Sequence, residues 1–198
     1  MKKLFLGAAI AMSSLTFAQQ FGIKAGMNVS SISNDGWDDS KAKVGFYGGL
    51  FMNAPLAESF SIQPEILYNN LGSKTETTVA GTKYSSTLNL DYIAVPVMFQ
   101  YNATPEFYLE AGPEFGFLVN ASSKATAGNN SNITNIDTDS FNKFNMGIGL
   151  GAGFNITNKL GINARYVAGL NDVTDNDKWG SDASNKNNNF QVGLAYKF

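Results

Sequence analysis

The sequence predicts an all-β fold: a single antiparallel up-and-down transmembrane β-barrel of about eight strands, with short periplasmic turns and long external loops. Three observations lead to this prediction. Segments with apolar residues at every second position recur along the chain, short and long connections alternate between them, and only 15% of the residues are charged. Successive side chains of a strand point to opposite faces, so each such segment has one apolar face and one polar face.

The N-terminal residues 1–18 have the three-part layout of a secretory signal peptide. Two lysines precede an apolar stretch over 4–12, and Thr16 and Ala18 stand at the −3 and −1 positions of a cleavage site. A transmembrane anchor is the alternative, but this stretch is too short to cross roughly 30 Å of hydrocarbon as a helix. We therefore expect residues 1–18 to be cleaved and residues 19–198 to form one outer-membrane β-barrel domain.

Eight segments carry the alternation, and the segment 144–156 is the most regular. Its apolar side chains occupy one face, and Gly and Asn occupy the other. Repeated glycines also occur in nucleotide-binding loops, but that motif needs a helix after the glycines. We therefore expect the glycines to make room for large side chains in a narrow barrel interior. The predicted strands span residues 21–29, 44–52, 60–69, 84–101, 107–117, 144–156, 160–168 and 190–198.

The segment 84–101 leaves the direction of its side chains open. Leu88 and Leu90 favour one face, whereas the apolar residues from Ile93 onward favour the other. A β-bulge near Asp91 would reconcile the two halves, because an extra residue shifts every later side chain to the opposite face.

The connections between these segments sort into short and long ones, as in outer-membrane barrels. The short connections lie near 53–58, 102–106 and 157–159, and the long ones cover 31–43, 72–85, 121–142 and 171–188. We expect the Asn/Ser/Thr-rich stretch 122–139 to be a solvated, mobile loop.

A soluble barrel such as a lipocalin is the rival architecture. A soluble exterior is usually about 25–35% charged, whereas the polar face here consists mostly of Gly, Asn, Ser and Gln. Aromatic residues also recur near the strand ends, where a membrane-interface girdle would place them. These residues are Tyr68, Tyr101, Phe107, Tyr166 and Phe198.

The final segment alternates without exception and ends on an aromatic residue. This pattern is typical of the closing strand of bacterial outer-membrane barrels, where the barrel-insertion machinery reads it as a signal. We therefore predict localisation in the bacterial outer membrane after export through the periplasm. The residues of the predicted insertion signal are Phe190, Val192, Leu194, Tyr196 and Phe198.

Little in the sequence supports catalysis or a cofactor. The chain has no His and no Cys, which excludes Cys nucleophiles and Cys/His zinc sites. Glu110 and Glu114 share a face, but four residues of strand separate them by roughly 13 Å, beyond the roughly 5–9.5 Å of glycosidase pairs. The aspartate-rich stretch 172–182 fails the EF-hand pattern, because Trp179 and Lys186 stand where oxygen ligands are needed. The net charge of −2 argues against a nucleic-acid surface.

Six charged residues lie on the polar face of the predicted strands. We expect them to pair across the interior as a salt-bridged plug, since an eight-stranded barrel is just wide enough for side chains to fill. The alternative is a selective lining of an open channel. These lumen-facing residues are Lys24, Glu65, Glu110, Glu114, Arg165 and Lys197.

Several strings resemble the porin-like, PorT-type family of small outer-membrane β-barrel proteins. They are FGIKAGMNVS at 21–30, DYIAVPVMFQY at 91–101, FYLEAGPEFGFL at 107–118, NMGIGLGAGF at 145–154 and INARYVAGLNDV at 162–173. The resemblance implies the barrel fold, and the family name implies a pore, with one branch linked to a protein secretion and gliding system. It matches no catalytic motif.

Two functions of different class follow. One is a non-enzymatic structural barrel that binds partners through its external loops. The other is a narrow passive channel for small polar solutes, or a component linked to a protein secretion system. The expected partners are outer-membrane lipid and lipopolysaccharide, the barrel-insertion machinery, and an external protein or surface ligand. We expect no cofactor, no metal site and no nucleic-acid partner.

Overall fold

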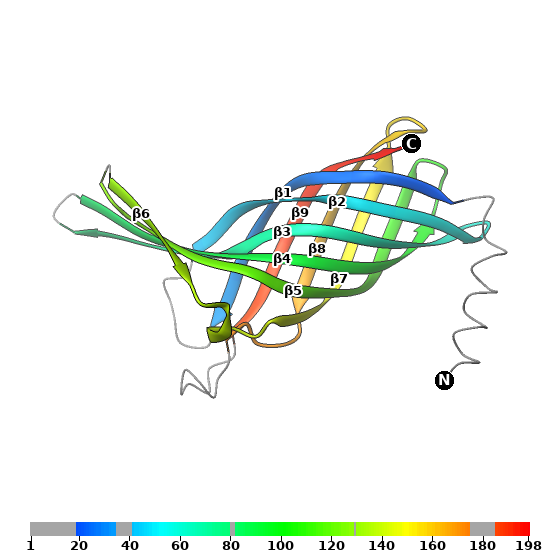
Figure 1. Cartoon of the computed structure of the whole chain (residues 1–198). Coiled ribbons are helices and arrows are strands. Elements are labelled where there is room, and N and C mark those ends of the chain that lie inside the picture. Colours follow the sequence, from blue (N-terminus) through cyan, green and yellow to red (C-terminus); the bar gives the residue numbers. More distant parts are fainter. Residues whose placement is uncertain (1–18, 35–40, 80–81, 129, 175–184) are drawn as a thin grey trace, which may run out of the picture.

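The computed structural model of the chain describes residues 19–34, 41–79, 82–128, 130–174 and 185–198. The predicted signal peptide, residues 1–18, lies outside the described residues. Figure 1 shows a barrel from which several strands continue at one end as a long twisted ribbon. Within the described residues, no helix is long and apolar enough to cross a membrane.

Nine strands and one short 3-10 helix make up the described part of the chain. They are β1 (Gln20–Asn34), β2 (Lys41–Ala57), β3 (Phe60–Val79), β4 (Thr82–Asn102), β5 (Phe107–Ala127), β6 (Asn130–Ile136), η1 (Thr138–Ser140), β7 (Phe144–Asn155), β8 (Leu160–Gly169) and β9 (Asn185–Lys197).

Eight of these strands close into a ring. The order is β4-β3-β2-β1-β9-β8-β7-β5, and pairing between β4 and β5 completes the circle. Every pair is antiparallel, and β6 pairs only with β5 outside the ring. Closure removes sheet edges from the barrel, which a sheet in hydrocarbon requires. The predicted eight-stranded up-and-down barrel is therefore confirmed, with β6 as an addition.

The apolar faces of the strands point outward, as the alternation predicts. Met27, Leu50, Leu150 and Val192 are among the exposed apolar residues, whereas their polar strand neighbours face the interior. Exposed aromatic residues gather toward the short-turn end of the barrel: Phe21, Phe60, Tyr101, Phe107, Phe154, Tyr196 and Phe198. A second group lies toward the other end: Phe46, Phe117, Phe144, Tyr166 and Phe190. Two aromatic groups flanking an apolar band are typical of a membrane barrel.

The two ends of the barrel differ as expected, but two of the long connections, 72–85 and 121–142, consist largely of strands. Short turns join β2 to β3, β4 to β5 and β7 to β8 at one end. At the other end, β3 and β4 run to Val79 and Thr82, and β5 pairs with β6 over 121–136. The prediction of a mobile loop over 122–139 is therefore wrong. A hairpin that is polar on both faces shows no apolar alternation, so its sequence is easily mistaken for a loop.

We call the part of β3–β6 beyond the barrel the outer ribbon: residues 72–79, 82–91, 119–127 and 130–136. It is visible at the left of Figure 1.

The open question in 84–101 is resolved by the pairing of β4 with its two neighbours. The pairing of β4 with β3 runs through Asp91 without a shift, so β4 alternates without a break and the bulge predicted there is wrong. The register shift at this level comes from β5: Asp91 pairs with Asn120 and Tyr92 pairs with Leu118, so Val119 is an extra residue on that strand. Leu88 and Leu90 point inward like Tyr92 because they pack in a buried apolar cluster of the lumen, whereas Ile93 and the later apolar residues face outward.

Candidate functional site

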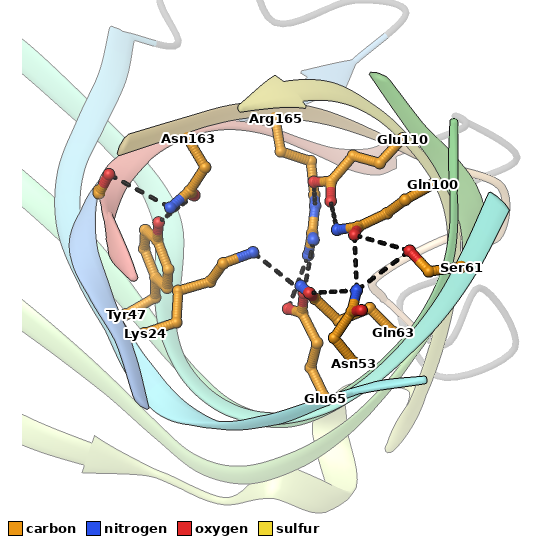
Figure 2. A network of polar contacts seen from close by, with 11 residues as sticks. Lys24, Tyr47, Asn53, Ser61, Gln63, Glu65, Gln100, Glu110, Asn163 and Arg165 are labelled. Carbon is orange, nitrogen blue, oxygen red and sulfur yellow. Dashed lines mark hydrogen bonds and ion pairs between the residues drawn. The ribbon is translucent and has the colours of Figure 1, made fainter. Parts of the chain in front are cut away.

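An ion-pair network occupies the middle of the barrel interior (Figure 2). The Arg165 guanidinium of β8 donates from Nη1 and Nη2 to both carboxylate oxygens of Glu65 on β3, at 2.9 and 2.7 Å. Its Nε donates to Glu110 Oε1 on β5 at 2.7 Å. Lys24 Nζ of β1 reaches Glu65 Oε1 at 3.0 Å. Four strands thus supply two cations and two carboxylates, and their formal charges cancel.

The contact between Arg165 and Glu65 crosses the bore. Strands β8 and β3 lie four places apart in both directions around the ring of eight, so they face each other. Both side chains are almost fully enclosed, with exposed fractions of 1% and 0%. The bidentate pair therefore spans the lumen between opposite strands at this level.

Neutral side chains satisfy the remaining positions of the two carboxylates. Gln63 Nε2 donates to Glu65 Oε1 at 2.8 Å, and Gln100 Nε2 donates to Glu110 Oε2 at 3.1 Å. The Gln100 carbonyl in turn accepts from Asn53 Nδ2 at 2.7 Å. Buried charges are tolerated only when paired and hydrogen-bonded, and these amides meet that condition. These amide side chains could have been predicted from the sequence, because they are polar residues at alternate, inward-facing positions.

Glycines on β7 make room for these long side chains. A Cβ atom added at Gly151 would lie 3.0 Å from Glu110 Oε1, and one at Gly153 would overlap the Tyr108 ring. The predicted role of the glycine repeat in 144–156 is therefore confirmed for the barrel interior.

Two of the six predicted lumen residues lie outside the network. Glu114 is buried, but its Oε2 has no hydrogen-bond partner, and no cation of the described residues forms an ion pair with it. Lys197 contacts Asn155 Oδ1 at 3.2 Å near the short-turn end. The prediction that all six charges pair with one another is therefore wrong for these two. Glu114 lies four residues along β5 from Glu110, two periods of the strand alternation, so the Arg165 guanidinium meets the nearer carboxylate of Glu110.

An apolar plug fills the lumen on the side of the outer ribbon. Its buried residues are Ile32, Leu71, Leu90, Tyr92, Leu118, Ala121, Phe141 and Val173. Two of them, Phe141 and Val173, lie in connections between strands. Hydrogen bonds from Asn142 hold these two connections together. Asn142 N donates to Val173 O at 2.9 Å, and Asn142 Nδ2 donates to Asp172 O at 2.9 Å and to Thr174 O at 3.1 Å. Phe141 and Val173 were not predicted as core residues, since neither belongs to an alternating segment.

A polar cavity of about 230 Å³ lies at the opposite, short-turn end. Its lining includes Asn53, Gln63, Gln100, Tyr108 and Lys197. The interior is therefore layered along the barrel axis: a polar cavity, the ion-pair network and the apolar plug. In this arrangement the cavity ends at the network.

The remaining sites expected from the sequence fall as follows. The residues of the predicted insertion signal face outward on β9, which pairs with β1 and β8, and Phe198 N donates to Phe21 O at 2.9 Å. The aspartates at 175, 177 and 182 lie outside the described residues. Among the residues that are described, no three His, Cys, Asp or Glu side chains gather as a group that could hold a metal ion.

Comparisons with known proteins agree with this architecture. The family described as outer membrane protein beta-barrel domain matches residues 17–175. Ail, the attachment invasion locus protein of Yersinia pestis, is 16% identical with a TM-score of 0.52, over 92% of this chain and 100% of that chain. Neisserial surface protein A is 11% identical with a TM-score of 0.55, over 91% of this chain and 99% of that chain. A second structure of Ail, in complex with the heparin analogue sucrose octasulfate, is 17% identical with a TM-score of 0.51, over 92% and 100%.

At these identities, the likeness to solved structures concerns the fold alone. Among curated proteins, none matches the chain. The family match covers most of the sequence, and the closed ring, apolar exterior and aromatic groups are those of a membrane barrel. The chain therefore belongs to the outer membrane protein beta-barrel domain family and is located in the bacterial outer membrane.

Proposed function

We propose that the protein is a non-conducting, non-enzymatic barrel that acts through its external segments, as a structural element or by binding a partner. The observation that carries this proposal is the Arg165–Glu65 pair across the bore. The apolar plug supports it independently, because it fills the lumen at a second level. An open channel for polar solutes would need both the Arg165–Glu65 pair and the apolar plug to move aside.

A non-enzymatic role is supported by the chemistry of the chain. Without His or Cys, a histidine base and a cysteine nucleophile are missing from the sequence. Glu110, a carboxylate that could act as an acid or base, is bonded to Arg165 inside the lumen and faces no external surface.

External binding is supported by the outer ribbon, which presents a four-stranded sheet beyond the barrel (Figure 1). Two similar solved barrels are Neisserial surface protein A and the attachment invasion locus protein of Yersinia pestis, the latter also in complex with a heparin analogue. These names concern those proteins. We extend to this chain only the proposal that its external segments bind a ligand or protein.

Finer features of the proposal come from the sequence. They are the cleaved signal peptide over 1–18, recognition of β9 by the barrel-insertion machinery, and membership of the PorT-type, porin-like branch with its link to secretion. Lipopolysaccharide is the expected neighbour on the outer side, because long strands and loops of such barrels face outward.

The test is a planar-bilayer recording on purified, refolded mature protein. We expect no steady conductance from the unmodified protein. Glu65→Ala/Arg165→Ala removes the central pair while keeping charge balance, and because the apolar plug remains, this variant should also pass no steady current. A leak in this variant, with none in Lys159→Gln at a surface turn, would show that the ion pair and not the plug closes the lumen. Robust single-channel currents from the unmodified protein would overturn the proposal. They would favour the narrow channel, with the polar cavity as its vestibule.

A further inference from the structure

Four lysines lie on one face of the sheet that leaves the barrel. Lys41 on β2 pairs with Lys74 on β3, Lys74 pairs with Thr87 on β4, and Thr87 pairs with Lys124 on β5. Residues paired directly across antiparallel strands share a face. Lys83 on β4 joins the same face, because its Nζ meets Glu76, two residues along β3 from Lys74. We call Lys41, Lys74, Lys83 and Lys124 the lysine row.

The lysine row lies on the face that continues the lipid-facing side of the barrel. Leu71 on β3 and Ala121 on β5 point inward and belong to the apolar plug. Lys74 and Lys124 each lie three positions further along, and odd spacing in a strand changes the face. The lysines therefore point away from the plug and lie on the same side of the sheet as the apolar exterior of the barrel.

Positive charge is in excess here. Among the described residues, the carboxylate that contacts these lysines is Glu76, at 3.1 Å from Lys41, 2.7 Å from Lys74 and 2.9 Å from Lys83. Within this described cluster, four lysines against one glutamate leave three positive charges. Lys41 and Lys83 remain 60% and 63% exposed, whereas the Glu76 side chain is only 15% exposed. On the described part of the outer ribbon the other acidic residue is Asp91, which is buried and bonded to Asn70 and Asn120.

The height of the row above the apolar band indicates its partner. On the barrel exterior, Val44 of β2 lies three residues from Lys41, and Tyr68 of β3 lies six residues from Lys74. At about 3.3 Å per residue and a tilt of about 40°, the lysines lie roughly 8–15 Å beyond the band. Phosphate groups of outer-leaflet lipopolysaccharide lie in this layer, and lysine ammonium groups bind phosphate as point charges.

We propose that the lysine row binds phosphate groups of lipopolysaccharide in the outer leaflet beside the barrel. Glu76 holds three of the ammonium groups at a common position, and Lys124 adds a fourth along the same row. The proposal rests on the proposed function only in placing the outer ribbon on the outer side of the membrane. It assigns the exterior face of the ribbon to lipid and leaves its interior face to other partners.

The experiment measures binding of purified mature protein in detergent micelles to lipopolysaccharide, to the same lipopolysaccharide after phosphatase treatment, to inorganic phosphate and to heparin. Lys74→Gln/Lys83→Gln/Lys124→Gln should weaken binding to intact lipopolysaccharide about 100-fold, at about fivefold per lysine. Lys159→Gln, at a turn on the opposite end, should leave it unchanged. Binding to phosphatase-treated lipopolysaccharide should be weak for every variant.

Lys124→Gln keeps the test free of folding effects, because Lys124 forms none of the ion pairs with Glu76. It should lower affinity about fivefold by itself. Equal binding by the triple variant and the unmodified protein would overturn the proposal. So would heparin or inorganic phosphate binding as tightly as lipopolysaccharide, which would assign the row to a soluble anion. Neither result would alter the bilayer recording, so failure here is distinguishable from failure of the non-conducting barrel.

Discussion

Arg165→Met should lower the free energy of unfolding by about 3–5 kcal/mol, the usual cost of removing one partner of a buried ion pair. The substitution deletes three hydrogen bonds between the guanidinium and the carboxylates of Glu65 and Glu110. It leaves two buried carboxylates facing one cation, Lys24. Because the side chains are 1% and 0% exposed, solvent cannot replace the lost partner without entering the barrel.

A second variant separates charge imbalance from loss of packing. Arg165→Met/Glu110→Gln removes one charge of each sign and leaves the Lys24–Glu65 pair at 3.0 Å. It should therefore recover more than half of the stability lost in the single variant, since the excess negative charge is gone.

The assay is urea unfolding in lipid vesicles, followed by circular dichroism and by heat-dependent electrophoretic mobility. Lys159→Met serves as the control and should stay within about 0.5 kcal/mol of the unmodified protein, as surface substitutions usually do. An Arg165→Met variant as stable as that control would refute the network. A double variant less stable than the single one would show that packing of the guanidinium, and not its charge, matters.

Three further predictions concern the exterior, the outer ribbon and the last strand. Leu150 is 60% exposed on the lipid-facing side, so Leu150→Arg should cost about 2–4 kcal/mol in the vesicle assay, and a harmless result would reverse the inside–outside assignment. The pKa of Glu76 is lowered to about 2, first by the hydrogen bond from Lys74, so its ionic contacts should persist above pH 4.5 and be lost only as pH falls toward 2. NMR titration of the carboxyl carbon should show that low midpoint, and Lys74→Gln should raise it; an unchanged midpoint would contradict the cluster. Deleting Phe198, whose ring packs edge-on against Tyr196, should leave the protein unassembled in membrane fractionation, and normal assembly would remove its role as an insertion signal.

Which residues face lipid and which face the lumen could be predicted from the sequence. A strand alternates its side chains by local backbone geometry, so burial on one face leaves a period of two that needs no tertiary information. For this reason Leu150, Gly149, Glu65 and Arg165 were all placed on the correct face. The glycines of β7 were interpreted correctly for the same reason, since they occupy every second position opposite large side chains.

The irregular regions were harder to predict. The change of apolar face in 84–101 suggested a bulge near Asp91, but β4 alternates without a break, and Leu88 and Leu90 face inward because they pack in the apolar plug. Residues 122–139 were mistaken for a loop, because threonine, serine and asparagine fill both faces of that hairpin. There, pairing with neighbouring strands decides the structure, and a polar sequence does not reveal its partner.

The sequence by itself determined the membrane barrel, its eight ring strands and the inward direction of six charges. Only the closed ring decided which charges meet. Strand tilt and closure bring β8 opposite β3, so Arg165 finds Glu65, a hundred residues away, while Glu114 is left without a cation. They also bring Phe141 and Val173 from two connections into one plug. The side of the sheet to which a side chain points is set by its place among consecutive residues, whereas contact across a lumen depends on the register of every strand between the partners.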